Sequence, residues 1–387
     1  MTDGTRRARA AGVRFAAMTT ATATAREGHT EPDWNELAKK IREWGRELGF
    51  DEIGIAGTDL GADETRLVAW LAAGRHGTMD YMARHGARRA RPAELVPGTL
   101  TVITARLNYL PPAARASEDV LADPSKAFVA RYALGRDYHK VLRTKLERLA
   151  RRIREDAGAF GYRVFTDSAP VLEVALAAKS GLGWRGKHTL LLTRDAGSWF
   201  FLGEIYTSLP LPQTPAQTAH CGSCTACIDV CPTHAIVGPY ELDARRCIAY
   251  LTIEHVGSIP EDLRPLIGNR IYGCDDCQLV CPWNRYAQIS SEAGFAVRNG
   301  LDDADLVALF AWSESEFLER TAGSAIRRIG FDRWSRNIAV ALGNAPHEPA
   351  VVAALTARAL DPSPLVREHV AWALAQHRDR ASIAAPT

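Results

Sequence analysis

The sequence lacks any uninterrupted apolar run of about 18 residues, which is the length that a transmembrane helix needs. Its formal net charge is only +2, so no global electrostatic field draws the protein onto nucleic acid or an anionic membrane. No apolar segment follows the pair Arg6 and Arg7, and a secretory or twin-arginine signal is therefore not expected. These absences predict a cytoplasmic protein that does not bind a membrane.

The sequence also offers no G-x-G-x-x-G loop that opens a helix after a strand, which argues against a Rossmann unit for NAD or FAD.

Eight cysteines are present, and all of them lie between residues 221 and 281. In a long chain without a signal peptide, such crowding favours thiolates that hold a metal over disulfide bonds. The first run is Cys221-x2-Cys224-x2-Cys227-x3-Cys231-Pro232. The second run is Cys274-x2-Cys277-x3-Cys281-Pro282, with Cys247 as its displaced first member.

The first run has the spacing of bacterial two-cluster ferredoxins, in which the fourth cysteine serves the other cluster. This exchange predicts one 4Fe–4S cluster held by Cys221, Cys224, Cys227 and Cys281. It predicts a second held by Cys231, Cys247, Cys274 and Cys277. The alternative is two structural zinc sites, but zinc ribbons use paired C-x2-C hooks rather than runs that end in Cys-Pro. Two clusters side by side form an electron-transfer chain, so a redox centre is expected next to one of them.

Helical and strand patterns alternate before the cysteines, whereas only helical patterns follow them. Helices are expected at 34–48, 65–73, 137–157 and 170–180, and strands at 51–56, 99–107, 162–166, 190–193 and 198–206. Further helices are expected at 333–342, 349–360 and 364–376, where the segment 361–374 looks like part of a HEAT-type repeat. The predicted fold class is multi-domain α+β. Its parts are a disordered extension (1–32), an α/β domain (33–208), a ferredoxin-like 4Fe–4S domain (209–290) and a HEAT-like helical domain (291–380).

Six motifs resemble those of one enzyme family. They are RYALGRDYHK at 131–140, DSAPVLE at 167–173, GLGWRGKHT at 181–189, DARRCIAYLTIE at 243–254, GNRIYGCDDCQLVCPWN at 268–284 and NIAVALGN at 337–344. In this order they resemble epoxyqueuosine reductase over about residues 33–376. The first thirty residues lie outside the resemblance.

The resemblance implies reduction of epoxyqueuosine to queuosine at the wobble position of tRNA, the last step of queuosine biosynthesis. It implies a cobalamin in the α/β domain, which is related to reductive dehalogenases, with electrons fed to its cobalt by the two 4Fe–4S clusters. The implied partners are the anticodon stem-loop of tRNA and an external low-potential electron donor, and the protein is expected to be a monomer. Two rival functions are a cobalamin-dependent reductive dehalogenase and an electron-transfer ferredoxin adaptor that binds no cobalamin.

Asp137 matches the proton donor of this family, and opening an epoxide needs an acid because it leaves an alkoxide. Such an acid usually has a pKa raised by burial or apolar neighbours. From the residues alone a helix N-cap is the favoured role, since a long helix is expected to begin here, and the two roles are compatible. His139 is a second candidate. Because Leu142 replaces the glycine of an Asp-x-His-x-x-Gly motif, cobalamin is expected without a histidine ligand from this segment.

The expected cobalamin pocket consists of polar residues in loops between predicted elements, for which turn formation is the alternative role. These residues are Asp167, Ser168, Trp184, Lys187, His188 and Thr189. Gly181, Gly183 and Gly186 would let the backbone approach a corrin closely. Arginines at 245, 246, 327, 328, 333 and 336 suit a phosphate-binding face for tRNA, against the alternative of an ordinary solvated helical face.

Overall fold

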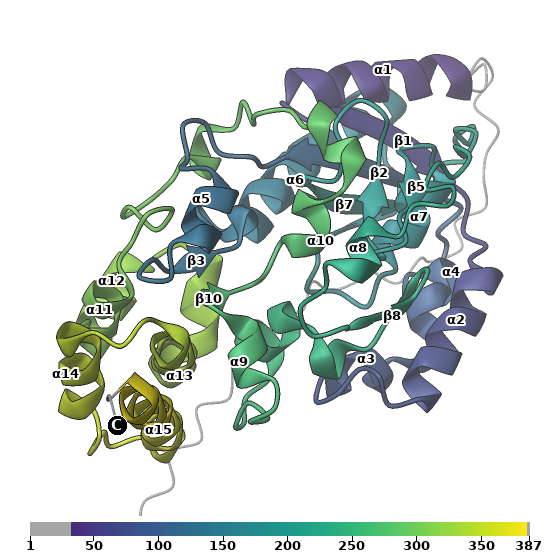
Figure 1. Ribbon diagram of the computed structural model, residues 1–387. Coiled ribbons are helices and arrows are strands. Elements are labelled where there is room, and N and C mark those ends of the chain that lie inside the picture. The colour runs from purple at the N-terminus through teal and green to yellow at the C-terminus, as the bar shows by residue number, and fades with distance from the viewer. Residues whose placement is uncertain (1–31, 385–387) are drawn as a thin grey trace, which may run out of the picture. The chain divides into compact units, whose positions relative to one another are not determined.

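Four strands form the central antiparallel sheet of the computed structural model, which describes residues 32–384 (Figure 1). The sheet has the order β1-β2-β7-β4, with bounds β1 Glu52–Ala56, β2 Thr101–Asn108, β7 Phe200–Thr207 and β4 Tyr162–Phe165. Ile55, Ile103 and Ile205 lie directly opposite one another on neighbouring strands. Because cross-strand partners point to the same face, these three side chains form a continuous apolar stripe across the sheet.

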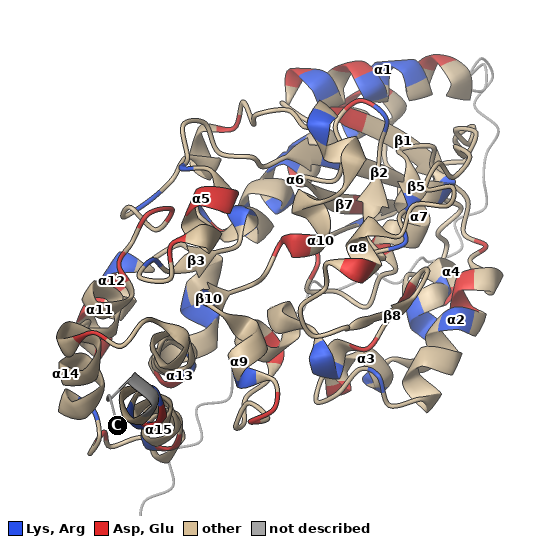
Figure 2. Cartoon of the chain, in the orientation of Figure 1, with Lys and Arg blue, Asp and Glu red and all other residues tan. Residues whose placement is uncertain are grey.

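Helices α1 (Trp34–Glu47) and α6 (Tyr138–Ala157) pack on this isoleucine face. In α6 the side chains of Leu142, Leu146 and Leu149 recur every three or four residues, so they point to one side and are buried. Fully burying each leucine contributes roughly 1.5–3 kcal/mol. The polar face of α1 carries basic and acidic side chains interspersed (Figure 2).

The opposite face of the sheet is covered by α7 (Glu173–Lys179). Leu176 of this helix packs there with Phe165 and Tyr206. Glu204 of β7 lies directly opposite Thr104 and Phe165 in the two neighbouring strands. Glu204 therefore faces the same side of the sheet as α7, although it belongs to an otherwise apolar strand.

Shorter elements surround the sheet and carry the cysteines. Among the described residues, four further helices of this kind precede the cysteines, namely α2 Gly61–Ala72, α3 Asp80–Arg84, α4 Pro92–Leu95 and α5 Ser117–Ala122. A hairpin joins β5 Trp184–Arg185 to β6 Leu191–Leu192. The cysteine segment contains α8 Ala226–Asp229, β8 Ile236–Gly238, β9 Glu241–Leu242, α9 Arg264–Ile267 and α10 Asp276–Leu279.

A parallel pair of short strands links the cysteine segment to the α/β part, because β10 (Arg270–Tyr272) pairs with β3 (Phe128–Val129). The C-terminal region is helical, with α11 Leu306–Phe310, α12 Glu314–Arg320, α13 Gly330–Asn344, α14 Pro349–Ala357 and α15 Pro364–Ala384. Helix α13 packs against both α15 and β10, so one apolar core joins the helical region to the cysteine segment.

The expected helices and strands of the sheet region are present, but two helices begin elsewhere than expected: α2 begins at Gly61 rather than at residue 65, and α7 begins later than expected. A helix with Pro170 in its first turn was expected over 170–180, whereas α7 begins only at Glu173. Residues 167–172 instead form a tight loop that lets the Glu173 side chain turn back onto the backbone of Asp167. This loop brings Glu173 back to Asp167, so two acidic residues lie close together.

Two glycines in the motif at residues 181–186 are required by close packing within the fold. A Cβ on Gly183 would lie 2.1 Å from the backbone oxygen of Leu192, so this glycine lets β5 approach β6. A Cβ on Gly186 would lie 2.7 Å from the ring of His188. Both glycines therefore have a packing role, and their expected approach to a corrin stays a prediction.

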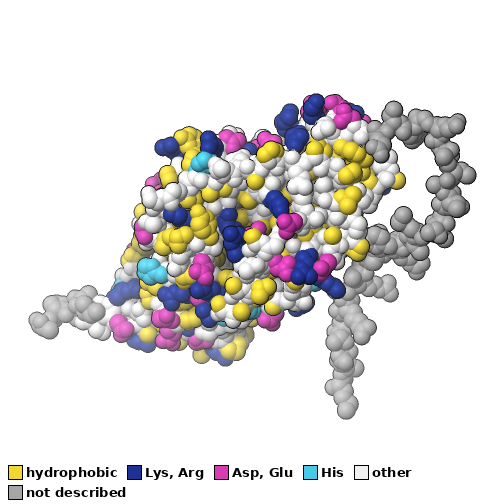
Figure 3. Space-filling view, turned by 90° about the vertical axis from the view of Figure 1, so that its right-hand side faces the viewer, with side chains coloured by type: hydrophobic (Ala, Val, Ile, Leu, Met, Phe, Trp, Pro, Cys, Tyr) yellow, Lys and Arg dark blue, Asp and Glu magenta, His cyan; other side chains and the backbone are white. Residues whose placement is uncertain are grey.

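No helix within residues 32–384 is both long enough and apolar enough to cross a membrane. The predicted disordered extension, 1–32, falls outside the described residues except for its last position. On the face shown in Figure 3, positive, negative and apolar side chains are mixed, as a nearly neutral chain would lead one to expect.

Candidate active site

The cysteines predicted for the first cluster surround one cavity. Cys221, Cys224, Cys227 and Cys281 line this space of about 270 Å³, together with Lys187, His188 and Trp283. Cys224 is exposed, whereas Cys227 and Cys281 are buried. Burial raises the pKa of the Cys227 thiol to about 11. A thiolate at this position therefore needs a neighbouring cation, as the iron of a cluster would provide.

The cysteines predicted for the second cluster border another cavity of about 430 Å³, and they are Cys231, Cys247, Cys274 and Cys277. Burial raises the pKa of the Cys247 and Cys277 thiols above the ordinary range as well. Each group takes its fourth member from the other cysteine run, as the crossed spacing predicts. The assignment of individual ligands stays a prediction.

A buried polar network holds the cysteine segment against the sheet. The Gln278 side chain donates to the Ser198 carbonyl at 3.1 Å, and the Asn284 side chain donates to the Gln278 carbonyl at 2.6 Å. The Ser198 backbone N–H donates to Asn284 Oδ1 at 2.7 Å. Gly197 has φ +63°, and a Cβ there would lie 2.0 Å from Asn284 Oδ1, so only glycine fits this junction.

The larger of the two cysteine-lined cavities, of about 430 Å³ and called the larger cavity below, joins the second cysteine group to the α/β part. Besides the cysteines, the cavity is lined by the aromatic side chains of Tyr109, Tyr132, Tyr138 and Phe201, and by Asp167, Glu173 and Thr189. An adjoining cavity of about 700 Å³ is bordered by the same three polar residues and by Arg89 and Tyr240. Asp167 (φ +47°) and Thr189 (φ +74°) adopt left-handed backbone conformations, which are uncommon outside glycine and collect at functional sites.

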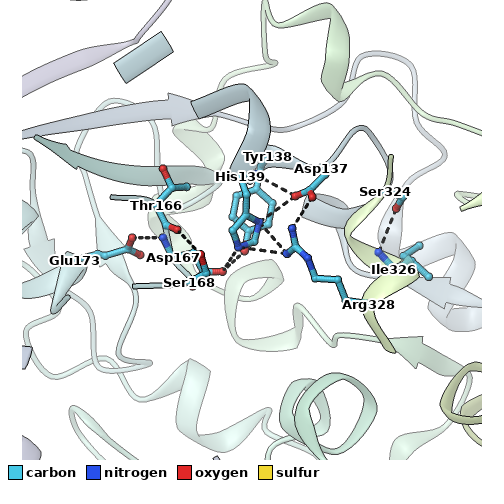
Figure 4. Close-up of polar contacts among 10 residues, drawn as sticks. All are labelled: Asp137, Tyr138, His139, Thr166, Asp167, Ser168, Glu173, Ser324, Ile326 and Arg328. Atoms are coloured by element: carbon cyan, nitrogen blue, oxygen red, sulfur yellow. Dashed lines mark hydrogen bonds and ion pairs between the residues drawn. The ribbon is translucent and has the colours of Figure 1, made fainter. Parts of the chain in front are cut away.

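Asp137 caps α6 and is also the centre of a charged network (Figure 4). Its Oδ1 accepts from the His139 backbone at 3.2 Å and lies 3.0 Å from His139 Nδ1. Its Oδ2 accepts from Arg328 Nη2 at 2.5 Å. Burial would raise the pKa of Asp137, but the hydrogen bond from His139 and the charge of Arg328 outweigh burial and lower it. The expectation of a raised pKa is therefore wrong for this conformation, because Arg328 pairs with the carboxylate.

The network continues from His139 to the loop before α7 (Figure 4). His139 Nε2 lies 3.2 Å from Asp167 Oδ2, so both ring nitrogens of this histidine face carboxylates. The Tyr138 hydroxyl also donates to Asp167 Oδ2. Burial would lower the pKa of His139, but its hydrogen bonds with Asp137 and Asp167 raise it, against the charge of Arg328, whose Nη1 lies 2.9 Å from His139 Nδ1.

Sequence reasoning missed two acidic residues that lie beneath this network. Glu173 accepts the backbone N–H of Asp167 at 2.5 Å, and burial followed by the charge of Asp167 raises the pKa of Glu173 to about 8. Glu204 is fully buried, and burial followed by the charge of Glu173 raises its pKa well above the ordinary range. The available signal was a single acid inside the apolar strand FFLGEIYT.

The residues expected in the cobalamin pocket are divided between the two cavities. Asp167 and Thr189 border the larger cavity, and His188 borders both. The Lys187 ammonium donates to the carbonyls of Gly222 and Cys224, on the side of the first cysteine group. Trp184 packs in that same region against Cys281 and Trp283, and Ser168 borders neither cavity.

Burial of His188 lowers its pKa to about 4, so its imidazole is neutral. Its Nε2 atom is buried and has no hydrogen-bond partner among the described residues.

The arginines expected on a phosphate-binding face have different environments. Arg336 is fully buried and donates to the carbonyls of His255 and Gly257 at 2.8 and 2.7 Å. The expectation is therefore wrong for Arg336, which joins α13 to the cysteine segment. Arg328, with about half of its side chain exposed, pairs with Asp137.

Comparison with known proteins gives the family. The family model described as Epoxyqueuosine reductase QueG, DUF1730 matches residues 89–168, and the 4Fe-4S double cluster binding domain matches residues 220–284. The epoxyqueuosine reductase of Pseudomonas aeruginosa is 60% identical over 347 residues, covering 89% of this chain and 96% of the relative. The chain belongs to the epoxyqueuosine reductase family. It is accordingly an oxidoreductase, and its cysteine-rich segment is a double 4Fe–4S cluster domain rather than a pair of zinc sites.

Two further relatives support the assignment. The Escherichia coli epoxyqueuosine reductase is 57% identical over 352 residues, which cover 91% of this chain and 92% of the relative. A crystal structure of an epoxyqueuosine reductase with an epoxyqueuosine-modified tRNA stem loop superposes with a TM-score of 0.81 at 27% identity, covering 91% of this chain and 95% of that one. The mixed α+β fold with its helical C-terminal region is therefore the fold of this family.

Proposed function

We propose that this protein reduces epoxyqueuosine to queuosine at the wobble position of tRNA, with cobalamin in the larger cavity and Asp137 as the acid. One observation carries the proposal. The cavity of about 430 Å³ has four cysteines on one wall and the Tyr138–Asp167 pair, next to Asp137, on another. Electrons and protons can therefore reach the same space from different lining residues.

The ligand sets of the two clusters follow from the grouping of the cysteines. Cys221, Cys224, Cys227 and Cys281 would hold the first cluster, and Cys231, Cys247, Cys274 and Cys277 the second. The exposure of Cys224 supports the first cluster as the point where an external donor delivers electrons. The second cysteine group borders the larger cavity directly, which supports the second cluster as the immediate donor to the reaction.

The larger cavity fits a corrin in its chemistry. Aromatic side chains such as Tyr109, Tyr132 and Phe201 suit the apolar faces of a large planar ring. The unpartnered, buried Nε2 of His188 offers a polar contact at the edge of the same space. Both ring nitrogens of His139 are already engaged by carboxylates, which supports binding without a histidine ligand from that segment. When bound, cobalamin and the clusters would supply the two electrons that the reduction needs.

Asp137 must be protonated to act as an acid. The Arg328 guanidinium, which stabilises the carboxylate, is half-exposed and is contributed by a short helical turn at 325–329 in the C-terminal region. Entry of the substrate nucleoside would draw Arg328 away from Asp137, for example onto a phosphate. Burial would then dominate and raise the pKa of Asp137, so that it gains a proton and can donate it to the opened epoxide oxygen.

The test uses anaerobically purified protein reconstituted with iron, sulfide and cobalamin. The protein is supplied with a low-potential reductant and tRNA that contains epoxyqueuosine, and the digested tRNA is analysed for queuosine by mass spectrometry. Queuosine should form only when cobalamin is present, and Asp137→Asn should abolish it. If fully loaded protein forms no queuosine, the proposal is wrong, and organohalides become the next substrates to test.

A further inference from the structure

The reaction needs more protons than one acid holds. Reduction of an epoxide to an alkene consumes two electrons and two protons and releases one water molecule. The first proton goes to the oxygen of the opened ring, and the second allows that oxygen to leave as water. Because a carboxyl group carries a single proton, Asp137 must be reprotonated between these events if it serves both.

Glu204 marks a place where a proton can be stored. It lies within β7 with 0% of its surface exposed, and neither carboxyl oxygen has a hydrogen-bond donor among the described residues. A buried carboxylate without a donor would be strongly destabilised, so Glu204 is expected to be neutral. The nearby hydroxyl of Tyr206, also fully buried, has no partner there either.

The neighbour of Glu204 is a second carboxyl group, that of Glu173, and the two are within hydrogen-bonding reach. Glu204 is fully buried and Glu173 is partly buried. Two carboxylates in contact repel each other, whereas one proton held between them gives each group a hydrogen bond. The raised pKa of both groups agrees with a proton retained at neutral pH. Glu173 also accepts the backbone N–H of Asp167, whereas Glu204 has no donor among the described residues other than this shared proton.

A continuous set of polar groups leads from this pair to Asp137. Glu173 and Asp167 border the same two cavities, so a water molecule can lie between their carboxyl groups. Asp167 Oδ2 lies 3.2 Å from His139 Nε2, and His139 Nδ1 lies 3.0 Å from Asp137 Oδ1. The imidazole can accept a proton on one nitrogen and release one from the other.

We propose that Glu173 and Glu204 share a stored proton that passes through Asp167 and His139 to Asp137 after the acid has given its first proton to the substrate. This inference rests on the proposed function. Asp137 then delivers the second proton, and the oxygen leaves as water. The two electrons come from the external low-potential donor, and the emptied carboxyl pair is refilled from solvent through the cavity.

Other groups face the pair and influence when it loses its proton. The Arg89 guanidinium is buried nearby and donates to the carbonyls of Tyr81 and Ala169, and its charge favours ionisation of Glu173. The hydroxyls of Tyr138 and Tyr206 also face the pair, and both have raised pKa values because of burial, followed by the charges of neighbouring carboxylates. Arg328 and His139 lower the pKa of Asp167 and so influence the pair indirectly.

The first experiment measures the stored proton itself. Infrared spectra of the purified protein at neutral pH should contain the C=O stretch of a buried protonated carboxylic acid. Glu204→Gln should remove this band and Glu173→Gln should shift it, because Glu204 then loses its carboxyl partner, whereas Glu155→Gln, on the exposed face of α6, should leave it unchanged. Absence of the band from the wild-type protein would overturn the proposal. This readout does not depend on whether the protein makes queuosine.

The second experiment measures the pH dependence of a single turnover on tRNA. The wild-type rate should fall as pH rises through about 8, where Glu173 loses its proton. The two Gln variants should be slower than wild type by roughly tenfold at pH 7. They should approach the wild-type rate at low pH, where solvent can protonate Asp137. Unchanged pH profiles in both variants would overturn the relay.

Cobalamin binding, measured by absorbance, tests whether Glu173 and Glu204 hold the cofactor instead of passing a proton. Both Gln variants should bind cobalamin as the wild type does, and weaker binding would overturn the proposal in favour of a cofactor contact. Asp167→Asn leaves the buried pair in place, so it should keep the infrared band and still slow the turnover. A wild-type protein that shows the band but forms no queuosine would refute the proposed function instead.

Discussion

The two roles of Asp137 can be separated by comparing Asp137→Asn with Asp137→Ala. Asparagine caps helices about as well as aspartate, whereas loss of an N-cap to alanine costs about 1 kcal/mol. The ion pair with Arg328 adds less than about 1 kcal/mol, because 48% of the arginine side chain is exposed. The alanine variant should therefore be about 1 kcal/mol less stable than the asparagine variant, since both lose the ion pair.

Catalysis should not distinguish the two variants, because neither side chain can donate a carboxyl proton. Removing a general acid typically costs 10²–10⁴ in rate, so both single-turnover rates should fall by about that factor. Thermal unfolding followed by circular dichroism measures the stability difference on samples with matched iron and cobalamin content. Equal melting temperatures for the two variants would refute the capping role. A wild-type rate in the asparagine variant would refute the acid.

Three further predictions follow from the same network. Arg328→Gln removes the cation that lowers the pKa of Asp137, so the pKa of the Asp137 carboxyl, measured by infrared titration without tRNA, should rise, whereas Arg320→Gln, which has similar exposure, should leave it unchanged. Cys281→Ser should leave about four irons in place of about eight and should spare the second cluster in electron paramagnetic resonance. Glu173 has a pKa raised from 4.5 to about 8, so the folded protein holds a proton that the unfolded chain releases. The melting temperature should therefore fall as pH rises through this window, and Glu173→Gln should flatten that slope.

Local patterns in the sequence were sufficient for much of this protein. The cysteine spacing predicted which thiols line each of the two cavities, because a short loop can wrap a cluster and the exchanged fourth ligand closes the count. The recurrence of Leu142, Leu146 and Leu149 predicted the buried side of α6, since helical geometry repeats every 3.6 residues. The cap at Asp137 could also be predicted from the sequence, because an N-cap depends only on the next few residues.

Contacts between distant residues could not be predicted in this way. Arg328 is 191 positions from Asp137, and no local pattern indicates that its guanidinium lowers the pKa of the acid. Arg336 looked like one of several surface arginines, yet tertiary packing buries it completely. Glu173 and Glu204 come from a helix and a strand that meet only when α7 packs on the sheet. Sequence patterns determined which elements form, whereas burial and long-range charge, which arise only on folding, decided the protonation of the site.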